Sequence, residues 1–165
     1  MKKIICLLVF VVFFFGVQKN TLALYKPYLK VEADQATYSQ KVATYSPTDQ
    51  QKLTDLSNQI IQINKDDVEQ LSLQIDAQAA ILDEYQRRNH NQTNPQIDKA
   101  RYWLTYAHEA VAFQLVQAYI FNLTSEKNIK SDATQTVNKF EGDLSSTRTK
   151  VINSLNIIKD LVKND

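Results

Sequence analysis

The polar side chains best suited to chemistry lie together in the most apolar stretch of the 165-residue chain. His108 and Glu109 are adjacent, and Tyr102, Tyr106 and Glu109 share one helical face at i, i+4 and i+7. An apolar setting can shift the pKa of an imidazole or carboxyl group into the range useful for acid–base catalysis. These four residues form a candidate polar cluster. The alternative is that His108 and Glu109 lie at the edge of a bundle, or hydrogen-bond a tyrosine or Arg101.

The chain lacks the other parts of common catalytic and metal-binding sites. No Glu or Asp precedes a His by three residues, so the Glu-x-x-His pairs of di-metal bundles are absent. No nucleophile has an adjacent base and orienting acid. Asp66, Asp67 and Glu69 lack the spacing and the glycine of a calcium loop, and the single methionine, Met1, excludes His/Met haem ligation. We therefore expect no catalytic residue, no metal and no cofactor.

Glycine is scarce, since the chain has 2 glycines where average proteins have about 7%. Tight turns and phosphate-binding loops depend on glycine, so β-sandwiches, β-barrels, Rossmann domains and P-loops are disfavoured. Hydrophobic residues make up 44% of the chain and charged residues 22%, which is ordinary for a folded protein. The length suits one domain with a real core.

The first residues predict export. Two lysines precede an uncharged apolar run from Ile4 to Val17, and Thr21-Leu22-Ala23 offers small residues for cleavage after Ala23. We expect a signal peptide over residues 1–23 and a single helical-bundle domain over residues 24–165, secreted or extracytoplasmic. An uncleaved N-terminal membrane anchor is the alternative, and both place the body of the protein outside the cytoplasm.

Cleavage would change the charge and remove the single cysteine, Cys6. Three lysines and no acidic residue would leave, so the mature chain would carry 16 basic and 18 acidic residues, a net charge of −2. This balance gives no reason to expect nucleic acid or an anionic membrane surface as a partner. Without a disulfide, the fold must be held by its core.

Apolar residues recur at steps of three and four along four segments, which predicts helices. The first segment runs from Tyr28 to Tyr45 and ends before Pro47, because the residue before a proline avoids the helical region.

The second segment, from Thr48 to Arg88, has a register slip between Ile63 and Val68. The four residues from Asp66 have the Asp-x-x-Glu form of a capping box. Either one helix carries a kink here or a new helix begins at Asp66, and a break is favoured.

The third segment starts at Asn94-Pro95, an N-cap followed by proline at the first helical position. Between Ala100 and Leu123, 17 of 24 residues are hydrophobic, which predicts a central helix buried on more than one side. It carries a candidate interface stripe, which becomes a partner surface if the N-terminal helix leaves it uncovered. The stripe residues are Trp103, Phe113 and Ile120.

The last segment begins near Asp132 and shows a single amphipathic face. Short loops between long helices make them antiparallel neighbours. We predict an all-α fold, an elongated up-and-down antiparallel bundle of three long helices plus a shorter N-terminal helix, with coiled-coil-like packing.

The run ARYWLTYAHEAVAF, from Ala100 to Phe113, resembles a segment of uncharacterised secreted helical-bundle proteins of candidate-phyla bacteria. The similarity extends through Asp132 and Val151 to the C-terminus. It implies an exported bacterial protein, and it transfers no activity, ligand or functional residue.

Two functions of different classes follow. The favoured one is an exported, non-catalytic helical bundle that acts through protein–protein or cell-envelope interaction, and homo-oligomerisation is compatible with it. Membrane contact would come only through an uncleaved N-terminal segment. The alternative is a small ligand-binding or enzymatic bundle built on the polar cluster around His108 and Glu109. A closed core with an exposed apolar stripe favours the first function, and a pocket that encloses the cluster favours the second.

Overall fold

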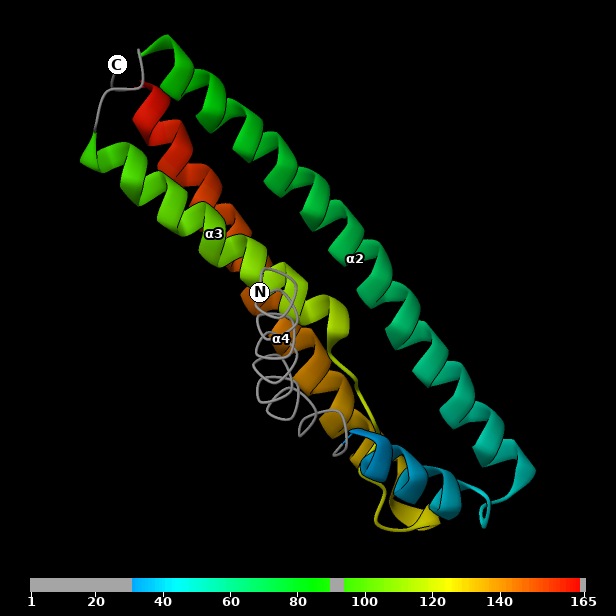
Figure 1. Ribbon diagram of the computed structural model, residues 1–165. Helices are drawn as coiled ribbons and strands as arrows, with labels where there is room; N and C mark the ends of the chain where they lie inside the picture. The colour runs from blue at the N-terminus through cyan, green and yellow to red at the C-terminus, as the bar shows by residue number, and fades with distance from the viewer. Residues whose placement is uncertain (1–30, 90–93, 164–165) are drawn as a thin grey trace, which may run out of the picture. The chain divides into compact units, whose positions relative to one another are not determined.

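The computed structural model describes residues 31–89 and 94–163 (Figure 1). The predicted signal peptide and its cleavage site lie outside the described residues. The chain divides between Tyr45 and Ser46 into two units, which are described separately. In the first unit, residues 31–42 form a helix, as predicted for this segment. No helix in the described ranges is long and apolar enough to span a membrane.

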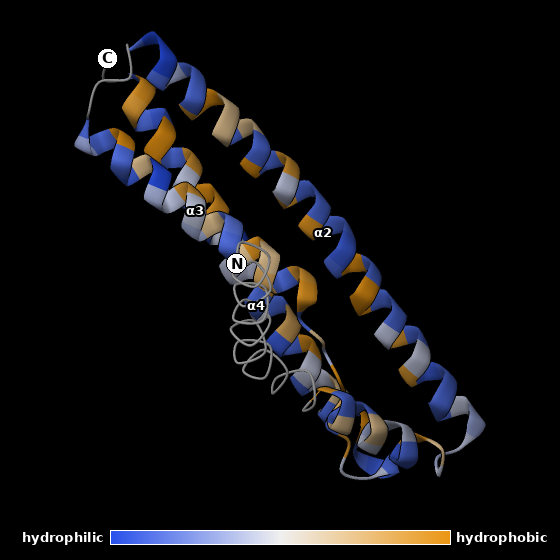
Figure 2. Ribbon diagram, in the orientation of Figure 1, coloured by the Kyte–Doolittle hydropathy of each residue, from blue (hydrophilic) through white to orange (hydrophobic). Residues whose placement is uncertain are grey.

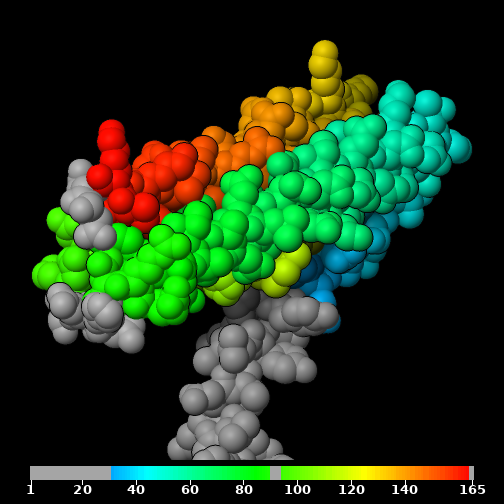
Figure 3. All heavy atoms as spheres, turned by 90° about the horizontal axis from the view of Figure 1, so that it is seen from above, coloured from blue at the N-terminus to red at the C-terminus, as the bar shows by residue number. Residues whose placement is uncertain are grey.

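The second unit is a bundle of three long helices. They are α2 (Pro47–Arg88), α3 (Pro95–Val116) and α4 (Ile129–Lys163), and a single 3₁₀ turn, η1 (Glu126–Asn128), precedes α4. Each long helix packs against the other two, and α3 runs opposite to α2 and α4 (Figure 1). The space-filling view shows α2 and α4 side by side along their length (Figure 3). The predicted all-α bundle is confirmed.

Two helices start at polar N-caps, of which Asn94 was predicted and Ser46 was not, since the second helix was expected to begin at Thr48. The Asn94 side chain accepts a hydrogen bond from the backbone N–H of Gln96 at 2.8 Å, and Pro95 takes the first helical position. Ser46 caps α2 in the same way, with Pro47 as the first helical residue. In both cases proline is tolerated because the first backbone N–H of a helix has no intrahelical partner.

The core of the second unit is a narrow apolar seam where the three long helices meet (Figure 2). Its clearest cluster joins all three helices near the end of α2. The cluster residues are Leu82, Ile97, Ala100, Ile158 and Leu161. The predicted face of α4 is largely confirmed, because Phe140, Leu144 and Val151 are all buried.

The favoured break at Asp66 is wrong, because α2 continues through it without interruption. The buried positions at the slip are Ile60, Asn64 and Val68, two successive four-residue steps, while Ile63 is 48% exposed. Two four-residue steps span eight residues, where the usual three-plus-four pair spans seven. The buried face therefore shifts by one residue while the helix continues. The slip therefore places a polar residue, Asn64, in the core and does not end the helix.

The predicted helix through Leu123 is also wrong, because α3 ends at Val116 and residues 117–125 form a connecting segment without regular secondary structure. The burial alternates, with Phe121 and Leu123 buried and Asn122 exposed. At about 1.5 Å per residue α2 is about 63 Å long and α3 about 33 Å. Because the end of α3 meets α2 at Asn64, α3 accompanies only the second half of α2, and Phe121 and Leu123 of the connecting segment are buried.

Two further features of α4 are its start and its glycine. The helix begins at Ile129, three residues before the predicted start at Asp132. Its glycine, Gly142, is exposed, and a Cβ placed there would meet no atom within 4 Å. Gly142 therefore marks no close helix crossing.

Candidate functional site

One face of α3 is exposed and largely apolar. Residues of this face recur at steps of four and three, and we call the set the α3 stripe. Its members are Tyr102, Tyr106, Glu109, Phe113 and Val116. The exposed fractions are 65% for Tyr102, 64% for Phe113 and 76% for Val116. The prediction that α3 is buried on more than one side is therefore wrong, because its buried residues share a single face.

The aromatic end of the α3 stripe is ordered by ring contacts. The rings of Tyr102 and Tyr106 are stacked, with centroids 6.4 Å apart and an interplanar angle of 4°. Trp103 meets both rings edge-on, at 5.9 and 5.8 Å. Lys150 of α4 places its ammonium group 4.8 Å from the centre of the Tyr106 ring. Such aromatic and cation–π contacts hold the rings in place while their outer faces remain in solvent.

The three predicted interface residues occupy different surroundings. Phe113 lies within the α3 stripe and is exposed. Trp103 is half-buried beside the stripe, between it and the core. Ile120 is half-buried in the connecting segment, because α3 ends four residues earlier. The structure thus keeps one predicted residue in the stripe, one at its edge and one beyond it.

The candidate polar cluster is brought together only in part. Tyr102, Tyr106 and Glu109 share the exposed face, as their spacing predicts, whereas His108 is rotated about 100° away from Glu109 around the helix. Both His108 and Glu109 are exposed, and neither has a hydrogen bond or ion pair with any residue in 31–89 or 94–163. The burial that the acid–base interpretation requires is missing at both side chains.

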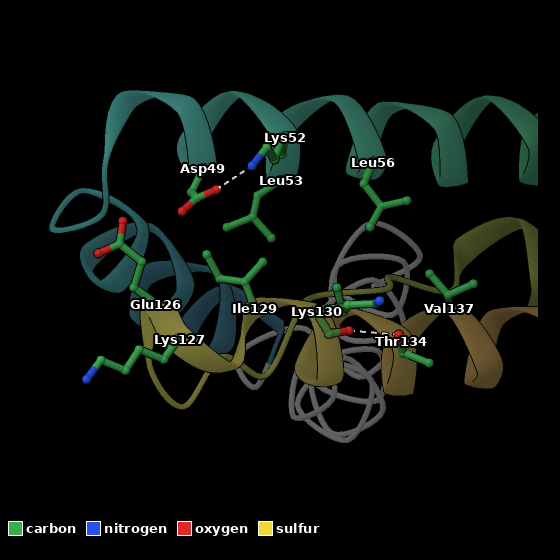
Figure 4. Close-up of a pocket in the computed structure, with 11 residues that line it drawn as sticks. Asp49, Lys52, Leu53, Leu56, Glu126, Lys127, Ile129, Lys130, Thr134 and Val137 are labelled. Atoms are coloured by element: carbon green, nitrogen blue, oxygen red, sulfur yellow. Dashed lines mark hydrogen bonds and ion pairs between the residues drawn. The ribbon is translucent and has the colours of Figure 1, made fainter.

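A groove of about 490 Å³ lies between the start of α2 and the start of α4 (Figure 4). Its apolar lining comes from both helices, and polar side chains stand at its edges. The apolar residues are Leu53, Leu56, Ile129, Ala133 and Val137, and the charged ones are Asp49, Lys52, Glu126, Lys127 and Lys130. None of these belongs to the predicted polar cluster or interface stripe.

The acidic groups of the groove are engaged within the protein. Lys52 Nζ lies 2.9 Å from Asp49 Oδ1, and this hydrogen bond holds the pKa of the Asp49 carboxyl below its usual value. Glu126 Oε1 accepts a hydrogen bond from the backbone N–H of Ser46 at 2.5 Å. No such partner holds the ammonium groups of Lys127 and Lys130 in the described part of the chain. The groove therefore offers an apolar lining and two unpaired cations.

A polar network that the sequence did not reveal joins the three long helices where α3 ends. Gln114 Nε2 donates to Asn64 Oδ1 at 2.7 Å and to the Tyr119 hydroxyl at 2.9 Å. That hydroxyl donates to Asp143 Oδ2 at 3.2 Å, and Lys139 Nζ lies 2.6 Å from the same oxygen. Burial raises the pKa of Tyr119 to about 12, and the nearby Asp143 carboxylate adds to the increase.

The network is structural in character. Each long helix contributes at least one member, and the linked amides lie in the core, with Gln114 1% exposed. Two signals in the sequence point to it: the polar Asn64 at the register slip, and the alternation Phe121-Asn122-Leu123-Thr124, which is typical of an extended segment.

Metal chemistry finds no support in the described residues. Nowhere in these ranges do three or more His, Cys, Asp or Glu side chains come together as potential ligands.

Comparison with protein-family models, with curated proteins and with solved structures finds no match.

Proposed function

We propose that this protein is an exported, non-catalytic helical bundle that acts by binding another protein through the α3 stripe. The observation that carries the proposal is the set of large apolar side chains exposed on one helical face. A cluster of exposed apolar residues on one face is typical of an interaction surface. Their steps of four and three match those of a helix that packs along a partner helix.

The export part of the proposal rests on the first residues of the chain. Lysines at positions 2 and 3, the apolar run from Ile4 to Val17 and the small residues before Leu24 support a cleaved signal peptide. The partner would then be a secreted or cell-envelope protein. N-terminal sequencing of the exported chain should begin at Leu24. An exported chain that retains Met1 would indicate an anchor, and a cytoplasmic chain would contradict export.

Site-specific photo-cross-linking in the producing cells tests the interaction surface. A photoreactive amino acid at Val116, which is 76% exposed in the α3 stripe, should give a covalent protein adduct. The matched control is Ile61, which is 62% exposed on α2 and outside the stripe. Tyr102→Asp should reduce the adduct at Val116, because it places a charge in the apolar contact.

The outcome that would contradict the proposal is equally plain. Adducts of the same yield at Val116 and Ile61, or none at Val116, would show that the α3 stripe is not the interaction surface. Unchanged circular dichroism of the Tyr102→Asp variant would exclude unfolding as the cause of any loss.

The non-catalytic part of the proposal is supported by the solvent exposure of His108 and Glu109. Glu109→Gln should leave the free energy of unfolding unchanged within about 0.5 kcal/mol, because the carboxylate has no partner in the described residues. Loss of turnover in this variant, with an unchanged melting temperature, would favour the enzymatic alternative, whereas loss of a protein partner alone would be consistent with the place of Glu109 in the α3 stripe.

The groove between α2 and α4 favours a second candidate, the binding of a small amphiphilic anion. An acyl chain would lie against Leu53, Leu56 and Val137, with its carboxylate beside Lys127 and Lys130. Calorimetric titration with decanoate should then show binding that decanol does not reproduce. Replacing both lysines by glutamate should abolish it, and equal binding of the two compounds would contradict this candidate.

A further inference from the structure

Lys99 and Glu109 lie on the same helical face as the apolar members of the α3 stripe. Lys99 precedes Tyr102 by three residues, and it therefore continues the steps of four and three. Glu109 lies between Tyr106 and Phe113 on that face. Both charges are exposed, and neither forms an ion pair within the described ranges. This helix face thus carries Lys99 and Glu109, charges of opposite sign ten residues apart, and exposed Asp98 lies beside Lys99 at its edge.

We infer that the occupant of the α3 stripe is a second copy of this chain, bound through its own α3 in the antiparallel direction. The inference rests on the proposed function of the stripe as an interface and specifies its partner. In this arrangement Lys99 lies opposite Glu109 of the second copy, and Tyr102 lies opposite Tyr106. Because such a dimer is two-fold symmetric, each of these contacts occurs twice.

Charge complementarity favours this arrangement over a parallel pairing and over an antiparallel pairing shifted towards Val116. A parallel pairing would bring Lys99 against Lys99 and Glu109 against Glu109, so both contacts would be repulsive. An antiparallel pairing shifted by one heptad would bring Glu109 against Tyr106 and Lys99 against Val116. That shift would bury both charges in the interface without an oppositely charged partner, which is energetically costly.

The chosen register also covers the aromatic part of the stripe. Residues 95 to 113 of the two helices overlap, a length of about 27 Å. Tyr102, Tyr106 and Phe113 all fall within this overlap, and Val116 lies three residues beyond it. Tyrosine rings that are already ordered by stacking lose little side-chain freedom on association, which favours binding.

Charge reversal tests the pairing, with sedimentation velocity on the chain as recovered from the expressing cell. Lys99→Glu and Glu109→Lys should each weaken self-association about tenfold, because each turns two attractive contacts into repulsive ones. The double variant should restore it, since the two charges are only exchanged. An equimolar mixture of the two single variants should also associate. Lys65→Glu, at an exposed position on α2, is the matched control and should change nothing.

The possible failures separate this inference from the proposed function. A monomeric wild-type chain, or a double variant that fails to restore association, would overturn the antiparallel second copy. If Val116 nevertheless cross-links to a different protein, the proposed function stands and only the identity of the partner is wrong. Absence of both self-association and cross-linking would overturn the two together.

Discussion

Asn64 of α2 and Gln114 of α3 form two hydrogen bonds with each other. Asn64 Nδ2 donates to the backbone carbonyl of Gln114 at 3.1 Å, and Gln114 Nε2 donates to Asn64 Oδ1 at 2.7 Å. This carbonyl lies in the last turn of α3, where it also accepts the backbone N–H of Gln117 at 3.3 Å. A side chain from a neighbouring helix therefore supplements the backbone hydrogen bond that ends α3, a helix without a terminal glycine or proline.

Truncating Asn64 should destabilise the protein. Asn64→Ala removes two buried hydrogen bonds, each worth about 0.5–1.5 kcal/mol, while the Gln114 carbonyl keeps the Gln117 N–H and its amide keeps the Tyr119 hydroxyl. Urea unfolding monitored by circular dichroism measures the change. Asn58→Ala, at an exposed position of the same helix, should stay within about 0.5 kcal/mol. Equal losses at the two positions would contradict the capping role.

Two leucines of α2 provide a test of the helical register. Leu82 is 0% exposed within the cluster that joins the three long helices, and Leu73 is 58% exposed. Leu82→Ala should cost about 2–5 kcal/mol, because it removes buried methyl groups and leaves a cavity. Leu73→Ala should cost about 0.5 kcal/mol or less. The reverse order in chemical denaturation would mean that α2 is rotated relative to the structure.

Gly142 offers a stabilising substitution. A Cβ at this position meets no atom within 4 Å, and the residue lies inside α4. Gly142→Ala should raise the free energy of unfolding by about 0.5–1 kcal/mol, since alanine loses less backbone entropy in a helix. A lower melting temperature in the variant would show that the position has a close neighbour.

Tyr119 should make stability depend on alkaline pH. Its pKa is about 12 in the folded protein and 10.0 in the reference state, so the folded chain keeps the phenolic proton longer. The stability that this shift contributes is fully present below pH 10 and is lost as the pH rises from 10 to 12. Tyr119→Phe should remove that part of the alkaline decline.

A spectroscopic titration isolates the same group. Tyrosinate absorbance of the folded protein should include a step near pH 12 that Tyr119→Phe lacks. Tyr102→Phe, at a position that is 65% exposed, should retain the step. Persistence of the step in the Tyr119→Phe variant would assign it to another residue.

The local signals in the sequence predicted most of the helical architecture. Asn94-Pro95 predicted the start of α3, and the steps of three and four predicted the buried face of α4, because caps and amphipathic periodicity act within one helix. The same spacing placed Tyr102, Tyr106 and Glu109 on one face. It did not indicate whether that face would be covered, since burial depends on how many helices surround α3.

By itself, then, the sequence determined that this protein is an all-α bundle of long amphipathic helices. Tertiary structure alone decided three things: that α2 continues past Asp66, that α3 stops at Val116, and that the α3 stripe remains exposed. Each depends on partners distant in the chain. Asn64 is buried because Gln114 can satisfy its amide, and the segment after α3 is held by the hydrogen bonds of Tyr119 with Gln114 and Asp143. Local propensity carries no information about such partners, so these features emerge only when the three helices pack together.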